Sequence, residues 1–247
     1  MKAMIFAAGL GTRLRPLTDT LPKALMDVGG KPALQRVIER LKAAGITEMV
    51  VNVHHFPDKI ISFLRDNGNF GVDIRVSDER DLLLDTGGGL LKAMPLLGAD
   101  EPVLLHNADI VSDFPISAMI SAHEATGADA TLLVADRPSS RRLLFDASGR
   151  MQGWKNMTTD EVRPAGCDVT GLVPLAFGGV HIVSLTLFPL LHDYGSRSGK
   201  VFSITPFYVD ACLMSDLQAF IPSAHYRWFD IGRPESLRVA SASFAGE

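Results

Sequence analysis

Short apolar runs alternate with segments of helical periodicity through the first half of the chain. Buried strands are predicted by the apolar runs at 4–8, 49–53, 72–76, 103–106 and 130–134. Between the first two runs, Leu34, Val37, Ile38 and Leu41 recur at helical spacing within 32–44, and Gly45 ends that helix. Further helices are predicted at 58–64, 87–94 and 116–126. This alternation predicts a three-layer α/β/α fold, in which helices cover both faces of a mostly parallel sheet.

The pattern changes after residue 136. The runs at 143–146 and 151–154 predict a hairpin, with Ala147-Ser148-Gly149-Arg150 as its turn. The remaining predictions are an apolar stretch at 172–183, a helix at 204–214, a strand pair between 217 and 229, and a closing helix from Pro234. With no internal repeat or linker, one domain over 1–247 is the economical interpretation. Within it, 1–136 forms the core, 137–225 is an elaboration able to cover a ligand, and 226–247 closes the chain.

Composition narrows the class of protein. The chain has 247 residues, of which 47% are hydrophobic and 21% charged, an ordinary globular balance. Its formal net charge of -4 argues against a general nucleic-acid binder. No apolar run reaches the roughly 20 residues that a membrane helix needs, so we expect a soluble protein that does not bind membranes. Two cysteines without metal spacing, Cys167 and Cys212, predict buried free thiols and a cytoplasmic location.

The segment after the first predicted strand is rich in glycine and basic residues. It reads Ala7-Ala8-Gly9-Leu10-Gly11-Thr12-Arg13-Leu14-Arg15-Pro16-Leu17-Thr18, and Pro22-Lys23 follows. Gly9 and Gly11 allow a tight turn in which several amide N–H groups face one anion. Arg13 offers a planar fork suited to phosphate oxygens, and Lys23 a compact second charge. An ordinary strand-to-helix turn does not need these basic residues, so the segment predicts a phosphate-binding loop.

A second glycine run, Asp85-Thr86-Gly87-Gly88-Gly89, opens a predicted helix. Glycines there permit close approach of a flat ring, and the first N–H groups of a helix are available to a ligand. Capping of that helix by Asp85 or Thr86 is expected in either case.

A carboxylate, Asp109, follows the apolar strand that ends in His106-Asn107-Ala108. Taken alone, Asp109 could be a turn former. At the carboxyl end of a strand and beside a phosphate loop, it is a hard oxygen ligand placed for Mg²⁺.

The long N-terminal motif resembles the signature of the sugar-1-phosphate nucleotidylyltransferase family, and the match extends through Gly30-Lys31-Pro32. Trp228-Phe229-Asp230-Ile231-Gly232-Arg233-Pro234 is similar to the family's C-terminal motif, from which Arg233 departs, as Ala108 departs from the motif around Asp109. The resemblance covers nearly the whole chain. It implies a Rossmann-like nucleotidyltransferase fold of the glycosyltransferase-A type with a sugar-binding elaboration. Leu84 to Gly89 looks like the short bacterial members that act on N-acetylmuramate 1-phosphate or heptose 1-phosphate.

The resemblance also implies roles for individual residues. Arg13 and Lys23 would be catalytic, stabilising charge on the phosphates. Nucleotide binding is implied for Ala8, Gly9, Gly11, Thr12, Arg13, Lys23, Asp85, Gly87 and Gly88. Sugar-phosphate binding is implied for Asn107, Lys155, Asp168 and Gly179, although Gly179 and its neighbour Gly178 could equally form a strand bulge. The metal ligands would be Asp109 and Asp230, two distant carboxylates that can converge on one ion.

The implied reaction joins a sugar 1-phosphate to a nucleoside triphosphate, UTP or GTP, with Mg²⁺ as cofactor. A homo-oligomer is compatible with this interpretation. A dinucleotide-binding oxidoreductase is disfavoured because the loop at Gly9 lacks the third glycine of that fingerprint. Two alternatives stay open: a cytidylyl- or molybdenum-cofactor-type nucleotidyltransferase, and a non-catalytic homologue that binds nucleotide-sugars.

Overall fold

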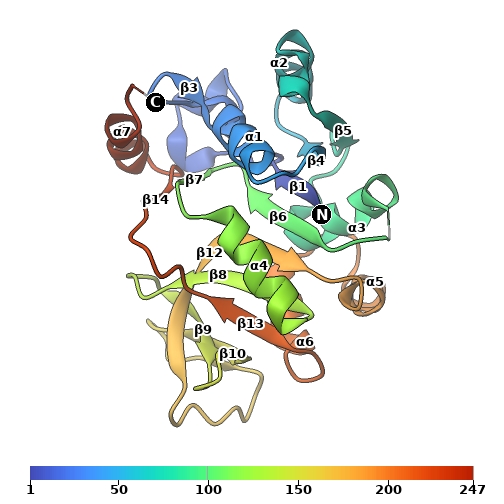
Figure 1. Ribbon diagram of the computed structural model, residues 1–247, viewed down its shortest axis with the longest axis vertical. Coiled ribbons are helices and arrows are strands. Elements are labelled where there is room, and N and C mark those ends of the chain that lie inside the picture. Colours follow the sequence, from blue (N-terminus) through green and yellow to red (C-terminus); the bar gives the residue numbers. More distant parts are fainter. Residues whose placement is uncertain (99, 247) are drawn as a thin grey trace.

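The computed structural model describes residues 1–98 and 100–246, and ten strands of this part form one large mixed sheet (Figure 1). Its N-terminal half consists of parallel neighbours in the order β6-β1-β4-β5. Their bounds are Lys2–Phe6 for β1, Glu48–Val53 for β4, Asp73–Asp78 for β5 and Val103–Asn107 for β6. The carboxyl ends of these strands therefore lie along one edge, where a ligand site is expected.

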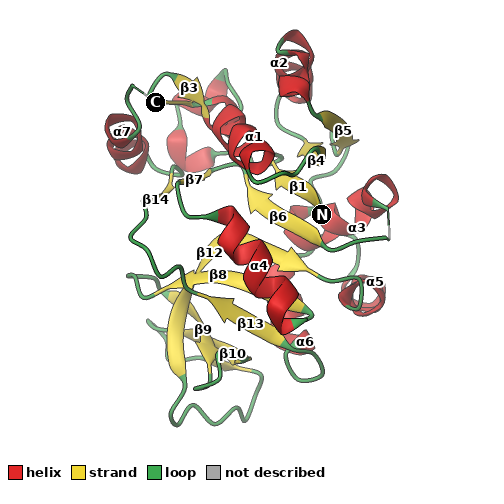
Figure 2. Ribbon diagram, in the orientation of Figure 1, coloured by secondary structure: helices red, strands yellow, loops and turns green. Residues whose placement is uncertain are grey.

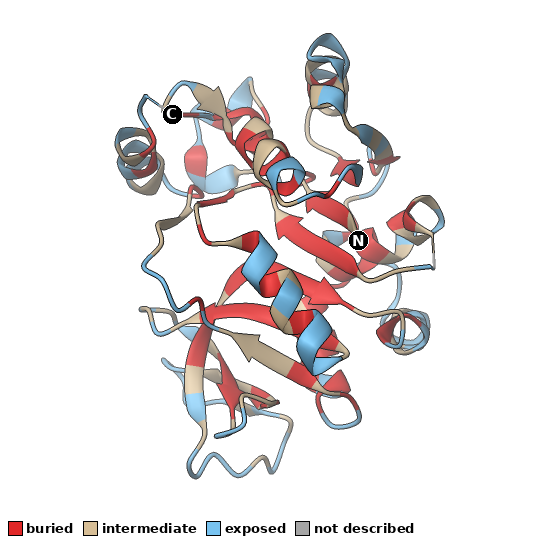
Figure 3. Ribbon diagram, viewed as in Figure 1, coloured by how far each residue is buried: buried red, intermediate tan, exposed pale blue. Residues whose placement is uncertain are grey.

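Helices cover both faces of this sheet (Figure 2). Along β1, Ala3 and Ile5 belong to one apolar core and Met4 to the other, as the period of a strand requires. The first core is shared with α1 (Ala33–Ala43), α2 (Pro57–Asp66) and α4 (Ile116–Thr126). The second is shared with α3 (Asp85–Leu97), α5 (Leu187–Ser198) and α6 (Ile204–Ala211). In Figure 3 the central strands are buried, while α4 exposes its outer side.

The C-terminal half of the sheet is organised around β12 (Val173–Val183), which makes the sheet mixed. This strand runs antiparallel to β6, to β8 (Ala130–Ala135) and to β9 (Arg141–Phe145). Beyond β9 follow β10 (Met151–Asn156) and β11 (Val162–Arg163), and β13 (Leu217–Phe220) lies parallel to β8. The predicted α/β fold with a mostly parallel sheet is confirmed, and so is the hairpin, which is β9 and β10.

Two smaller pairs and a helix close the molecule near the carboxyl edge. β7 (Ile110–Ser112) pairs with β14 (Trp228–Asp230), and β2 (Asp27–Val28) pairs with β3 (Lys31–Pro32). The helix α7 (Pro234–Ser243) packs on these pairs through a third apolar cluster that includes Ile231 and Phe244.

Two expectations about the C-terminal half are wrong, namely the pairing of two strands and the burial of Cys167. The segments near 217 and 229 are strands, but β13 pairs with β8 and β14 with β7, so they do not pair with each other. The helix α5 was not predicted, and it contains Pro189 and Gly195, two residues of low helix propensity. In addition, Cys167 is only partly buried, whereas Cys212 is buried, and both thiols are free.

Candidate active site

The glycine-rich segment after β1 forms one wall of a pocket of about 500 Å³ at the carboxyl edge of the sheet, which we call the nucleotide pocket. Gly11 has φ +64, and a Cβ there would lie 2.7 Å from Thr18 Cγ2, so this turn requires glycine. The Thr18 hydroxyl donates to the Gly11 carbonyl at 2.8 Å. From the predicted nucleotide-binding set, the lining includes Ala8, Gly9, Gly11, Thr12, Arg13, Lys23 and Asp85.

Lys23 brings the two predicted metal ligands together. Its side chain is only 9% exposed, and its ammonium forms an ion pair with Asp109 and lies 3.7 Å from Asp230 Oδ1. Backbone contacts fix this convergence, because Asp230 is opposite Ile110 in the β7–β14 pair and Ile231 N–H donates to the Asp109 carbonyl at 3.0 Å. Thus two carboxylates distant in sequence meet at one cation.

Arg13 reaches the same place. A Cβ built on Gly232 would lie 2.9 Å from Arg13 Nη2, 2.9 Å from Lys23 Nζ and 2.8 Å from Asp230 Oδ1. The N–H of Gly232 also donates to Asp230 Oδ1 at 2.8 Å. Both predicted catalytic cations and the second carboxylate therefore surround a single glycine.

The second glycine run has a packing role that the sequence did not indicate. A Cβ on Gly87 would lie 2.2 Å from the Phe202 ring, and one on Gly88 would lie 2.1 Å from the Lys200 carbonyl oxygen. The N–H groups of Gly87 and Gly88 both donate to the Phe202 carbonyl. The expectation that these N–H groups are available to a ligand is therefore wrong. In this run, Asp85 and Thr86 are the residues that line the nucleotide pocket.

Capping at this run also differs from expectation. The Asp85 carboxylate accepts only from the neighbouring Thr86 N–H, at 2.6 Å, and no side chain caps α3. The Thr86 hydroxyl instead accepts from Ile204 N–H at 2.9 Å, at the start of α6. Thr86 therefore ties the nucleotide pocket to α6.

Two of the predicted sugar-phosphate residues lie together. Asn107 ends β6 and lines the nucleotide pocket, and a Cβ on Gly179 would lie 3.0 Å from its Nδ2. Gly179 has φ +73 within the register shift of β12, so the bulge interpretation is confirmed. Contact of either residue with a sugar phosphate stays a prediction.

The other two lie elsewhere. Lys155 Nζ pairs with Asp160 Oδ1 at 2.8 Å, and Asp168 Oδ1 accepts from Thr170 N–H at 2.9 Å. Neither residue lines the nucleotide pocket as the structure describes it, and their predicted roles are not supported by this arrangement.

Arg137 is a candidate that the sequence analysis missed. Its guanidinium stacks on the Trp228 ring at 3.7 Å from the centroid and donates to the Phe177 carbonyl. Burial lowers the pKa of Arg137, and the negative charge of Asp230 acts in the opposite direction. Arg137 lies directly after β8, but only tertiary structure places it near Asp230.

A second pocket of about 490 Å³ lies between the β9–β10 hairpin and α6, and we call it the sugar-side pocket because its lining lies within residues 137–225, the predicted sugar-binding elaboration. Its lining includes Trp154 and Phe177. It adjoins the nucleotide pocket, because Ser203 Oγ in its wall lies 3.5 Å from Thr86 Oγ1. None of its lining residues was predicted to bind a ligand. The alternation of side chains along β10 was the available signal.

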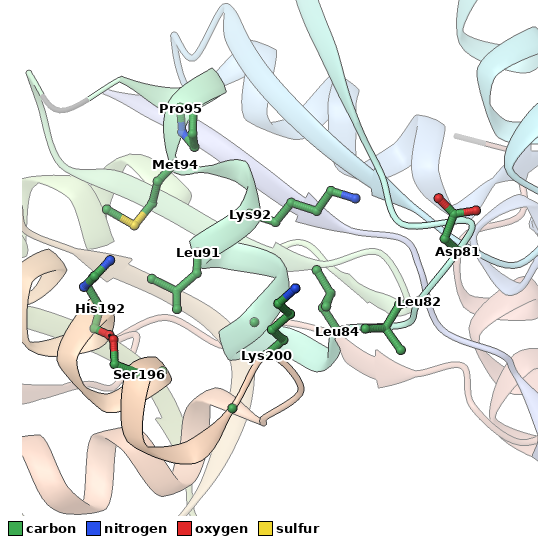
Figure 4. Close-up of a pocket in the computed structure, with 13 residues that line it drawn as sticks. Asp81, Leu82, Leu84, Leu91, Lys92, Met94, Pro95, His192, Ser196 and Lys200 are labelled. Atoms are coloured by element: carbon green, nitrogen blue, oxygen red, sulfur yellow. The ribbon is translucent and has the colours of Figure 1, made fainter.

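A groove of about 820 Å³ lies behind the start of α3 (Figure 4). Leu91 and Met94 of α3 and His192 of α5 line it, together with Leu82 and Lys200. It contains neither the phosphate loop nor the paired carboxylates, so the chemistry of the nucleotide pocket does not extend into it.

Asp109 and Asp230 are the two residues predicted to bind a metal ion. Among the described residues, no group of three or more His, Cys, Asp or Glu side chains could hold a metal ion. The two carboxylates are nevertheless partly exposed, with 29% and 42% of their side chains accessible, and they already share the ammonium of Lys23. Two carboxylates with further oxygens from phosphate groups is the usual donor set for Mg²⁺, so these residues fit that ion.

A glycine-rich loop beside two carboxylates at the carboxyl edge of a parallel sheet is typical of α/β proteins that bind phosphate groups. The nucleotidyl transferase family matches residues 2–145. An N-acetylmuramate α-1-phosphate uridylyltransferase of Neisseria meningitidis is 37% identical over 98% of this chain and 97% of its own length. The chain belongs to the nucleotidyl transferase family.

One further relative matches only part of this chain, and one solved structure matches its fold. A mannose-1-phosphate guanylyltransferase homologue of Oryza sativa is 40% identical over 56% of this chain, and the aligned part is 40% of its own length. The chain thus spans well under half of that relative. A solved structure from Bacillus anthracis, of a protein proposed to be a glucose-1-phosphate thymidylyltransferase, superposes with a TM-score of 0.82. It covers 100% of this chain and 96% of its own, and at 20% identity it supports the fold alone.

No helix within the described residues has the length and apolar character needed to cross a membrane.

Proposed function

We propose that the protein is a magnesium-dependent sugar-1-phosphate nucleotidylyltransferase, which converts a nucleoside triphosphate and a sugar 1-phosphate to a nucleotide-sugar and pyrophosphate. The observation that carries this proposal is the convergence of Arg13, Lys23, Asp109 and Asp230 beside the phosphate loop. A site with both cations and carboxylates suits a reaction between two polyanions, since it can neutralise charge and also hold a metal ion.

In the reaction, an oxygen of the sugar phosphate attacks the α-phosphorus. The new P–O bond forms as the bond to the β-phosphate oxygen breaks, and pyrophosphate leaves with the bonding electron pair. A sugar 1-phosphate is already ionised near neutral pH, so no general base is needed. The tasks left to the protein are alignment of the two substrates and neutralisation of their charge.

The residues of the nucleotide pocket divide these tasks. The turn at Gly9 and Gly11 accommodates the triphosphate, and Arg13 and Lys23 stabilise negative charge on the leaving pyrophosphate and the transferred group. Asp109 and Asp230 would hold Mg²⁺, which when bound supplies positive charge to the phosphate oxygens. Lys23 would keep the two carboxylates close together when no metal is bound.

The sugar-side pocket gives the second substrate a place. It adjoins the nucleotide pocket at Thr86 and Ser203, so a sugar there and a nucleotide opposite would meet near Asn107 and Asp109. Residues 1–136 would then bind mainly the nucleotide and 137–225 mainly the sugar.

UTP or GTP is the proposed nucleotide. The relative aligned over nearly its whole length is named for uridylyl transfer to N-acetylmuramate 1-phosphate, and the relative aligned in part is named for guanylyl transfer to mannose 1-phosphate. Both names describe nucleotidyl transfer to a sugar 1-phosphate, but the nucleotide and the sugar differ.

The test is a matrix of nucleoside triphosphates and sugar 1-phosphates with pyrophosphate release as the readout. We expect release only when a triphosphate, a sugar 1-phosphate and Mg²⁺ are all present, with UTP or GTP preferred. A matrix without any reacting pair would contradict an enzymatic function and favour a non-catalytic homologue that binds nucleotide-sugars.

A further inference from the structure

The sugar-side pocket is built on one face of the antiparallel part of the sheet. Arg141 lies opposite Asn156 in the β9–β10 register, and Leu143 lies opposite Trp154. Trp154 is in turn opposite Arg163 of β11. Residues directly opposite each other in an antiparallel pair share a face, so these side chains form two cross-strand rows, and all five line the pocket.

The floor of this pocket is aromatic. Trp154 and Phe177 both line it and are both partly buried. Aromatic rings present large apolar faces, which suit the C–H face of a pyranose ring, while Asn156 and Ser203 supply polar groups beside them. The pocket therefore has the composition expected for a carbohydrate, which agrees with the proposed function.

Its charge is unusual for a neutral sugar. Arg141, Arg163 and Glu161 are the charged residues of the described lining, so the pocket carries a net positive charge. Glu161 forms an ion pair with Arg163, with 2.7 Å between Glu161 Oε1 and Arg163 Nη2. The Arg163 guanidinium also lies over the Trp154 ring, 5.5 Å from its centroid. The Arg141 guanidinium has no ion-pair or hydrogen-bond partner within the described part of the chain.

We infer that the sugar-side pocket selects a sugar 1-phosphate that carries a carboxylate substituent, and that Arg141 binds this carboxylate. A guanidinium presents two parallel N–H donors that match a carboxylate, whereas sugar hydroxyls need no such charge. Arg141 is exposed and is the first residue of β9, so a substituent on the ring can reach it while the ring stacks on the aromatic floor. This inference rests on the proposed function, because it names the sugar of that reaction.

The test compares two sugars, one of which carries a carboxylate. N-acetylmuramate 1-phosphate is N-acetylglucosamine 1-phosphate with a lactyl ether in place of one hydroxyl, and the Arg141 variants separate the effect of its charge from that of its size. We expect the wild-type kcat/KM to be at least about tenfold higher for the acidic sugar, since hydrogen bonds to a charged group contribute about 1.5–3 kcal/mol. Arg141→Gln should lower kcat/KM for the acidic sugar by about 10- to 100-fold and for the neutral sugar by less than about threefold.

Two further variants complete the test, one as a conservative substitution and one as a control. Arg141→Lys keeps the charge but loses the fork, so it should recover part of the preference for the acidic sugar. Arg65→Gln removes an exposed arginine of α2 that lines neither pocket as the structure describes them, and should change neither sugar's kcat/KM.

The contradicting results are distinct. Equal losses with both sugars in Arg141→Gln would show that Arg141 serves the shared phosphate or the fold, and would overturn the inference. A wild-type enzyme that uses both sugars equally well would overturn it too, while leaving the proposed reaction intact. Absence of pyrophosphate release with every sugar and every triphosphate would instead contradict the proposed function itself.

Discussion

Gly232 lies where three charged side chains of the nucleotide pocket converge. A methyl group there would come within 2.9 Å of Arg13 Nη2 and Lys23 Nζ and within 2.8 Å of Asp230 Oδ1. These are ends of flexible side chains, so the backbone can tolerate the change while the charged groups must move apart. The residue thus couples the geometry of the catalytic cations to that of a carboxylate.

Gly232→Ala should therefore damage activity far more than stability. We expect kcat/KM to fall by roughly 100-fold, as when a preorganised charge is lost from a transition state, with a change in Tm of only a few degrees. Steady-state kinetics and thermal unfolding of the same preparation check this. Activity within fivefold of wild type would show that the spacing around Gly232 does not matter for catalysis.

Individual residues were predictable where a local motif carries them. Arg13, Lys23, Asp109 and Asp230 belong to short sequence patterns, and the structure brings all four together. Arg137 and Arg141 were missed because their surroundings depend on strand register and on the stacking of Trp228, neither of which a single sequence displays. The role of Lys155 stays a prediction, and its place in the sequence did not reveal its ion pair with Asp160.

At the scale of elements, the start of α3 is held against the segment before α6. Gly88 faces the Lys200 backbone, with 2.1 Å between a built Cβ and the carbonyl oxygen, whereas Gly89 faces the side chain of Glu79 at 2.9 Å. The two glycines are adjacent in one helix, so they have similar helix propensities and differ in what surrounds them.

Gly88→Ala should accordingly be much more destabilising than Gly89→Ala. The first clashes with a backbone carbonyl and must separate α3 from residues 200–202, at a cost of about 3 kcal/mol or more, typical of severe overpacking. The second displaces a side chain and partly gains helix propensity. Urea unfolding of both variants measures the difference, and equal stabilities would show that the α3 contact at Lys200 is loose.

Elements were predicted with uneven success for physical reasons. The helix Ile116–Thr126 was predicted with its observed bounds, because its flanking Pro115 and Gly127 mark both ends. The partners of β13 and β14 were not, because hydrophobic pattern identifies a strand but not the strand beside it. Likewise the triple glycine was interpreted as ligand-facing, although its close packing on Phe202 is visible only in three dimensions.

At the scale of the whole molecule, the sheet carries buried neutral histidines. Burial lowers the pKa of His106 to about 4 and that of His181 to about 3, from an ordinary value of 6.5. His181 Nδ1 lies 2.8 Å from the hydroxyl of Tyr208, which is buried as well. Both histidines belong to the junction of β6 and β12, which holds the two halves of the sheet together.

Stability should therefore fall in mild acid. Below pH 6.5 the two imidazoles bind protons in the unfolded chain, whereas in the folded chain they stay neutral down to about pH 4 or lower. The free energy of unfolding therefore decreases as pH decreases. From pH 7 to pH 5 we expect a loss of about 2 kcal/mol for each histidine. Urea unfolding at the two pH values checks this, and in His181→Gln the part of the loss due to His181, about 2 kcal/mol, should disappear. An equally steep loss in that variant would assign the acid sensitivity to other groups.

The central claim is that Asp109 and Asp230 share one metal ion during transfer, and the dependence of rate on Mg²⁺ tests it most directly. Asp230→Asn removes a negative charge but keeps size and one oxygen, so the fold should persist and the Mg²⁺ needed for half-maximal rate should rise. Asp109→Asn should behave alike, and the double variant should lose much less than the product of the two single losses, because residues that act as one unit are non-additive. An Asp230→Asn enzyme with unchanged rate and unchanged Mg²⁺ dependence would contradict the shared site.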